Sequence, residues 1–213
     1  MVSVSAQSII YFSRMNYKIS HPTKVINCEI DLPKSKSISN RLLIIKAICK
    51  DKFRIRNLSL SEDTTVLRNA LEQKNKTINV GAAGTSFRFL TSYLSTLESE
   101  NFILTGTERI KKRPIKELVD TLNALGAEIS YLNIDSPPLK ITGKKILGGE
   151  ISISGNVSSQ FISSLLLIAP TLKNGLTLNI VEDIVSRPYI NMTLKIMREF
   201  GINSSWVSNR IHI

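Results

Sequence analysis

The sequence predicts an α/β protein built from three repeated βαβαββ units, with buried helices that run parallel to one another. Short apolar strands alternate with segments whose apolar residues follow helical spacing. Helix boundaries also recur at an interval of 74 or 75 residues. The recurring pairs are Thr85 and Ser159, Pro114 and Pro188, and Gly126 and Gly201. Because caps, helix-starting prolines and helix-ending glycines all agree, we predict a structural repeat rather than chance similarity.

The repeats are expected to form a single domain over residues 17–213. Their expected limits are about residues 24–80, 81–145 and 149–213. Residues 1–16 are expected to be an extension outside the domain. Met15 is an alternative start of the protein, because an alternating segment begins at Tyr17.

In the first unit, an apolar stripe at helical spacing predicts a helix, and alternation of apolar and polar residues predicts strands. The elements are expected as strands at 24–32, 53–58 and 77–80, and as helices at 37–49 and from 62 onward. Pro33 ends the first strand, and Glu62 with Asp63 gives the second helix an acidic first turn.

The second unit begins with Gly81-Ala82-Ala83-Gly84-Thr85-Ser86, where glycines precede a Thr-Ser pair at a helix start. Its elements are expected as a helix at 85–97, a strand at 102–105, a helix that Pro114 opens and Gly126 ends, and strands at 128–132 and 139–142. Pro137 and Pro138 are expected to separate the last two strands.

The third unit repeats this order. Its elements are expected as strands at 150–154 and 176–181, a helix at 161–169, a helix that Pro188 opens and Gly201 ends, and strands at 204–207 and 210–213. The helix at 161–169 is apolar almost all round, which predicts that it is buried.

Composition indicates a globular protein without a membrane span. Of 213 residues, 42% are hydrophobic, and no run approaches the roughly 18 apolar residues that a span requires. No charged segment precedes the apolar part of the N-terminus, so no signal peptide is predicted. Cys28 and Cys49 match no metal-binding spacing and are expected to be reduced thiols in the cytoplasm. His21 and His212 lie near the ends and suggest no histidine-based catalysis.

The formal net charge of +11 calls for an anionic partner. Small anionic substrates and nucleic acid are both candidates. Aromatic residues make up only 6% of the chain and the basic residues are dispersed, so no recognition helix or single-strand-binding surface is predicted. A non-catalytic basic module that binds nucleic acid remains the alternative to an enzyme.

An anion site is predicted where three helices begin. The segment Leu32-Pro33-Lys34-Ser35-Lys36-Ser37-Ile38-Ser39-Asn40-Arg41 places cations and serines at a strand-to-helix junction. A helix N-terminus supplies free N–H groups and the positive end of the helix dipole. Parallel helices would gather Lys36, Ser37, Thr85, Ser158 and Ser159 on one surface. Such a surface fits a ligand with more than one charged group.

Five motifs resemble, in order, those of the 5-enolpyruvylshikimate-3-phosphate synthase family, the 3-phosphoshikimate 1-carboxyvinyltransferases. They are Ser35-Lys36-Ser37-Ile38-Ser39-Asn40-Arg41, Gly81-Ala82-Ala83-Gly84-Thr85-Ser86-Phe87-Arg88, Arg113-Pro114-Ile115 with Leu118-Val119-Asp120, Val157-Ser158-Ser159-Gln160-Phe161, and Ser186-Arg187-Pro188-Tyr189-Ile190. The resemblance covers residues 17–213. Five motifs in the family's order are much more specific than any one alone.

The resemblance implies one domain of the enolpyruvyl transferase fold, in a monomeric cytoplasmic enzyme of the shikimate pathway to chorismate and the aromatic amino acids. The family moves the enolpyruvyl group of phosphoenolpyruvate to the 5-hydroxyl of shikimate 3-phosphate and releases phosphate. It needs no metal or organic cofactor, and its partners are these substrates rather than nucleic acid or membrane. Family chains are considerably longer, so this chain is expected to be the N-terminal half, to lack a C-terminal domain and to be inactive alone.

The resemblance also assigns substrate binding to side chains within the motifs. Those expected to hold shikimate 3-phosphate are Ser37, Arg41, Ser158, Ser159, Ser186 and Tyr189. Those expected to hold phosphoenolpyruvate are Gly84, Arg88 and Arg113, and Thr85 is expected to bind substrate at the same helix start. Lys36 and Gln160 would contact both substrates, and Lys36 is the one catalytic residue expected, as a proton donor.

The chain departs from the family pattern at Ala82, where Asn is common, so one polar contact to phosphoenolpyruvate is expected to be missing. The pairs Glu62-Asp63 and Glu182-Asp183 are expected to be helix-start or loop charges that lie away from the anion site. UDP-N-acetylglucosamine enolpyruvyl transferases are an alternative within the superfamily. Those enzymes use a loop cysteine, which the loop around Lys111 lacks.

Overall fold

The computed structural model describes residues 29–49 and 53–213. The chain divides into Met1–Leu32 and Pro33–Ile213, and every described helix and strand lies in the second part. Within the described part, each helix is too short or too polar to span a bilayer.

Several predictions fall outside the described residues. They concern the extension at 1–16, the start at Met15, His21, Cys28 and most of the strand at 24–32. The described end of that strand, residues 29–32, has no regular secondary structure.

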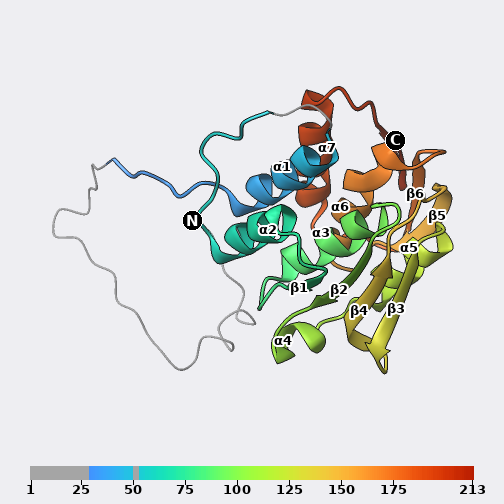
Figure 1. Cartoon of the computed structure of the whole chain (residues 1–213). Helices are drawn as coiled ribbons and strands as arrows, with labels where there is room; N and C mark the ends of the chain where they lie inside the picture. The colour runs from blue at the N-terminus through green and yellow to red at the C-terminus, as the bar shows by residue number, and fades with distance from the viewer. Residues whose placement is uncertain (1–28, 50–52) are drawn as a thin grey trace, which may run out of the picture. The chain divides into compact units, whose positions relative to one another are not determined.

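The described strands form two four-stranded sheets with the same connectivity (Figure 1). The first sheet consists of β1 (Thr77–Asn79), β2 (Asn101–Thr105), β3 (Glu128–Asn133) and β4 (Ser136–Thr142), in the order β1-β2-β4-β3. The second consists of β5 (Gly149–Ser154), β6 (Leu176–Val181), β7 (Ser205–Val207) and β8 (Arg210–His212), in the order β5-β6-β8-β7. In each sheet the first two strands are parallel and the other pairings are antiparallel.

The helices follow the predicted order, with one short helix, α4, that was not predicted. They are α1 (Lys36–Ile48), α2 (Glu62–Glu72), α3 (Gly84–Ser95), α4 (Glu108–Lys111), α5 (Lys116–Ala124), α6 (Ser159–Ile168) and α7 (Arg187–Glu199), with a short 3₁₀ turn, Ala169–Thr171, after α6. A parallel strand pair needs a crossover connection. Helix α3 accordingly joins β1 to β2, and α6 joins β5 to β6 (Figure 1).

The predicted α/β class is confirmed, but the threefold repeat is not. Two copies of the strand–helix–strand–helix–strand–strand order are present, each with its own sheet. Strand β1, predicted as the end of the first unit, pairs with β2 and therefore belongs to the second. Before β1, the described residues contain only the helices α1 and α2.

No strand forms at residues 53–58, where alternation predicted one. Phe53, Ile55 and Leu58 do pack against the core, while Arg54 and Arg56 are exposed. The alternation therefore predicted which side chains are buried. A strand also needs a neighbouring backbone to bond with, and the described ladders provide none for this segment.

Prolines at two element boundaries are placed differently from the prediction. Helix α5 begins at Lys116 rather than at Pro114. Pro137 and Pro138 lie inside β4 instead of separating two strands. Neither of these two prolines is paired, because pairing of β4 with β2 ends at Leu139. Their missing N–H groups therefore remove no ladder hydrogen bond.

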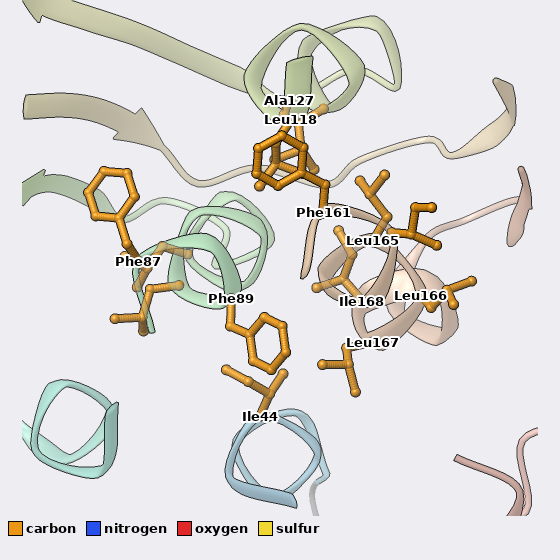
Figure 2. Packing of buried hydrophobic residues seen from close by; sticks show 14 of the residues in the cluster. Ile44, Phe87, Phe89, Leu118, Ala127, Phe161, Leu165, Leu166, Leu167 and Ile168 are labelled. Carbon is orange, nitrogen blue, oxygen red and sulfur yellow. The ribbon is translucent and has the colours of Figure 1, made fainter. Parts of the chain in front are cut away.

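The core is centred on helices α3 and α6, whose side chains interdigitate with those of α1 and α5 (Figure 2). Phe89 of α3 points toward Ile44 of α1, and Phe161 of α6 points toward Leu118 and Ala127 (Figure 2). Every residue of α6 except Gln160 is buried, as its all-round apolar sequence predicted. Packing on all sides fixes α6, and with it the residues at its N-terminus.

Replacing Phe89 by Ala should lower the free energy of unfolding by about 3–5 kcal/mol, because a fully buried ring leaves a cavity between helices. Urea denaturation measures this change. Leu60→Ala is the control, since Leu60 is 90% exposed and its truncation should change stability by less than about 0.5 kcal/mol. Equal losses for the two variants would contradict this description of the core.

Candidate functional site

Four helices begin around one cavity of about 380 Å³. Its walls come from the first turns of α1, α3, α6 and α7 and from the residues just before α6 and α7. The lining residues are Lys36, Ser37, Arg41, Thr85, Asn156, Val157, Ser158, Ser159, Gln160, Val185, Ser186 and Tyr189. The predicted gathering of three helix N-termini is therefore present, and the N-terminus of α7 joins them.

Serines stand at the helix starts around this cavity. Two of them cap their helices, and a third has a left-handed backbone conformation. Ser35 Oγ accepts a hydrogen bond from Ile38 N at 3.3 Å, and Ser158 Oγ accepts one from Gln160 N at 3.3 Å. Ser186, at the start of α7, has a left-handed backbone with φ 59° and makes no side-chain cap. First-turn N–H groups that remain uncapped, together with the dipole ends, favour an anion in the cavity.

A second cavity, of about 340 Å³, adjoins the first. It is lined by Lys36, Glu62, Asp63, Ala82, Ala83, Gly84, Thr85, Arg109, Arg113 and Gln160. Lys36, Thr85 and Gln160 line both cavities and form their common wall. Two ligands that occupied the two cavities would therefore meet at these three side chains.

Arg41 is a buried cation that ties three helices together. Its guanidinium donates to Thr193 Oγ1 at 2.7 Å, Ser163 Oγ at 2.9 Å, and the main-chain oxygens of Ser37 and Tyr189. Burial lowers the pKa of Arg41 to about 10, and the nearby Tyr189 partly opposes the shift. Arg41 is still charged at neutral pH, and these four acceptors are uncharged groups. Its positive charge is therefore not cancelled by them and acts on the adjacent cavity.

Arg88 and Arg113 meet around Gly84. A Cβ built on Gly84 would lie 1.9 Å from Arg113 Nη1 and 2.9 Å from Arg88 Nη1, so any larger residue there would displace the Arg113 guanidinium. Arg88 donates to Gly84 O and Pro114 O, both at 2.9 Å, and its Nε has no partner in the described residues. The pKa of Arg88 is lowered to about 10, mainly by burial and also by the charge of Arg113, while the carboxylate of Asp63 opposes both effects.

Asp63 lines the second cavity, contrary to the expectation from the sequence. Its Oδ2 forms an ion pair with Lys36 Nζ at 3.0 Å. As predicted, Asp63 is an acidic residue in the first turn of a helix, α2. The prediction that Glu62 and Asp63 lie away from the anion site is wrong, because both line the second cavity, whereas Glu182 and Asp183 line neither cavity. Only tertiary packing brings residues 36 and 63 together.

Of the predicted site residues, all but Arg88 line a cavity. Lys36, Thr85 and Gln160 line both. Ser37, Arg41, Ser158, Ser159, Ser186 and Tyr189 line the first, and Gly84 and Arg113 line the second. Arg88 is 2% exposed and lies behind Gly84, where it bonds to main-chain oxygens. The structure thus places Arg88 where it supports the loop, while the substrate roles stay predictions.

Several lining residues were not predicted. Outside the quoted motifs, they are Asn156 and Val185 in the first cavity, and Glu62, Asp63 and Arg109 in the second. Asn156 precedes a predicted motif, and Arg109 lies one turn before Arg113, so proximity to the motifs was the available signal. Among the described residues, no group of three or more His, Cys, Asp or Glu side chains could hold a metal ion.

Comparisons with known proteins agree on the family. The sequence model of the EPSP synthase (3-phosphoshikimate 1-carboxyvinyltransferase) family matches residues 65–212. A 3-phosphoshikimate 1-carboxyvinyltransferase of Bacteroides fragilis (strain YCH46) is 51% identical over 197 residues, which cover 92% of this chain and 48% of that protein. One from Colwellia psychrerythraea is 41% identical over 210 residues, covering 86% of this chain and 49% of that protein.

The fold is also that of a solved structure, the EPSP synthase from Acinetobacter baumannii. It superimposes with a TM-score of 0.74 at 22% identity, over 86% of this chain and 46% of that one. The chain spans about half the length of the curated relatives it matches. Because the family model matches more than half of the sequence, the chain belongs to the EPSP synthase (3-phosphoshikimate 1-carboxyvinyltransferase) family.

Proposed function

We propose that this chain is the substrate-binding half of a cytoplasmic, monomeric transferase that moves the enolpyruvyl group of phosphoenolpyruvate to the 5-hydroxyl of shikimate 3-phosphate. The observation that carries the proposal is the pair of adjoining cavities with the common wall of Lys36, Thr85 and Gln160. Group transfer between two anions requires two anion sites whose ligands touch in the reactive orientation. The names of the similar enzymes give 3-phosphoshikimate as the acceptor and a carboxyvinyl group as the group transferred, and phosphoenolpyruvate as the donor follows from the family resemblance of the motifs.

The first cavity suits shikimate 3-phosphate. Ser158, Ser159 and Ser186 offer hydroxyls at helix N-termini, which is favourable for a phosphate. Tyr189 is half exposed at the cavity wall, where its ring would flank a six-membered ring. Arg41 uses four of its five N–H donors within the protein, which leaves one on Nη1 for a substrate oxygen.

The second cavity suits phosphoenolpyruvate. Arg113 presents a planar guanidinium that can hold a phosphate or carboxylate with two hydrogen bonds. Ala82 lines the same cavity with a methyl group, in keeping with the polar contact expected to be missing. The cavity is open to solvent on this chain, and we propose that the remaining half of the enzyme closes it.

At the common wall, Lys36 is the side chain best placed to act in the reaction. The 5-oxygen must bond to the enolpyruvyl carbon while the methylene gains a proton and the hydroxyl loses one. Expulsion of phosphate then reverses both kinds of proton transfer. Lys36 can donate a proton, and Gln160 can hold both substrates. We propose that the other acid–base groups come from the missing C-terminal domain.

The chain should bind shikimate 3-phosphate in isothermal titration calorimetry. Replacing Ser158 and Ser159 together by Ala should weaken binding by about 2–3 kcal/mol, because two hydrogen bonds to a charged group are lost. Ser205→Ala is the control, since Ser205 is exposed on β7 and lines neither cavity. Unchanged affinity in the double variant would remove these serines from the phosphate site. An RNA oligomer that binds more tightly, with steep salt dependence, would favour a nucleic-acid module instead.

Arg113→Lys should raise the KM for phosphoenolpyruvate by about tenfold or more. It should change the KM for shikimate 3-phosphate by less than about twofold. The variant keeps the charge but loses the two-pronged contact. Arg113 lines only the second cavity, so its effect should be confined to one substrate. Steady-state kinetics of this chain supplemented with the C-terminal half of a family member measure both constants. Equal effects on the two substrates would contradict the assignment of the cavities.

The chain alone should release no phosphate from the two substrates. Its site lacks the opposing half that would exclude water and strengthen the electrostatic contacts. A phosphate-release assay, run before and after addition of a separately produced C-terminal half, tests this expectation. Activity that appears only on mixing supports the proposal. Turnover by the purified chain, unchanged after removal of host enzyme, would refute it.

A further inference from the structure

We infer that Asp63 is a specificity-determining residue of the anion site: it holds Lys36 while the site is empty and opposes small anions that make few other contacts. The inference rests on the two-cavity site proposed above. It concerns a carboxylate that neither the motifs nor the proposed substrate contacts include.

The position of Asp63 is fixed by α2 and α3. Ser86 Oγ, in the first turn of α3, donates to Asp63 O at 2.7 Å. The next residue, Thr64, donates from Oγ1 to Asn40 Oδ1 of α1 at 2.7 Å, and both side chains are buried. The carboxylate is therefore held in place by the same helix starts that form the site.

The contacts of the carboxylate are unequal. Oδ2 pairs with Lys36 Nζ at 3.0 Å, while Oδ1 is buried and has no hydrogen-bond partner among the described residues. The Asp63 side chain is 18% exposed and that of Lys36 is 46% exposed. A largely buried carboxylate is thus paired with one half-exposed ammonium group, and the surrounding positive charge stabilises it further.

This arrangement has an energetic consequence for binding. An anion that approaches Lys36 must compete with a carboxylate already in contact with the ammonium, and the two negative charges repel. A small anion gains few compensating contacts. A larger ligand also reaches the serines and helix N-termini of the first cavity, which lie beyond Asp63. The carboxylate therefore penalises small anions such as inorganic phosphate more than the extended ligand.

Modification of Lys36 by trinitrobenzenesulfonate, quantified by peptide mass spectrometry against Lys195, tests the inference on the whole chain. Asp63→Asn should raise the rate at Lys36 about threefold or more, because the ammonium group loses its ion-pair partner. The inorganic phosphate concentration that half-protects Lys36 should fall roughly five- to tenfold, because the repelling charge is gone. Half-protection by shikimate 3-phosphate should change less than about threefold.

Two matched variants separate this role from general charge or folding effects. Glu72→Gln removes the same charge from the exposed C-terminal end of α2, where the side chain lines neither cavity, and should change both readouts less than about twofold. Asp63→Glu keeps the charge and should leave half-protection by phosphate close to that of the original protein. Circular dichroism checks the fold, and Asp63→Ser replaces the Asn variant if that variant is unstable.

An unchanged Lys36 rate in the Asn variant, or equal phosphate effects for Asp63→Asn and Glu72→Gln, overturns the inference. Failure of phosphate to protect Lys36 in the Asn variant overturns it as well. If shikimate 3-phosphate protects no variant while phosphate follows the expected order, the proposed function fails and the inference on Asp63 stands.

Discussion

The burial of α6 among α1, α3 and α7 is the constraint on which the site depends. Nine of its ten residues are buried, so the helix can neither rotate nor slide without exposing apolar surface or overpacking its neighbours. Arg41 reinforces the arrangement from α1, because it donates to Ser163 of α6 and to Thr193 and Tyr189 of α7. Helices fixed in this way bring their N-termini to one surface, where a ligand can reach several dipole ends at once.

Two cations are buried beneath this surface. Arg41 and Arg88 are 3% and 2% exposed, and both donate to neutral oxygens rather than to a carboxylate. Uncharged acceptors satisfy the N–H groups without cancelling the charge, so the potential remains available to a bound anion. Within the site, the carboxylate of Asp63 forms an ion pair with Lys36 and so offsets part of this positive charge locally.

Duplication of one topology accounts for much of the geometry. The two sheets have the same strand order, and in each unit a helix follows the first parallel strand. Helices α3 and α6 therefore occupy equivalent positions in their units, and both contribute first-turn residues to the common wall of the cavities. A chain that spans about half the relatives' length thus contains two adjoining cavities with a common wall.

The order of most helices and strands, the burial of α6 and the position of the motifs at helix starts followed from the sequence, because apolar periodicity, caps and prolines act locally. The tertiary structure decided what depends on distant partners. Residues 53–58 alternate like a strand, yet they have no ladder partner. Arg88 belongs to a binding motif, yet it lies behind Gly84. Asp63 is an ordinary helix-start acid by sequence, and it became part of the site only because packing of α2 against α1 and α3 places it 3.0 Å from Lys36.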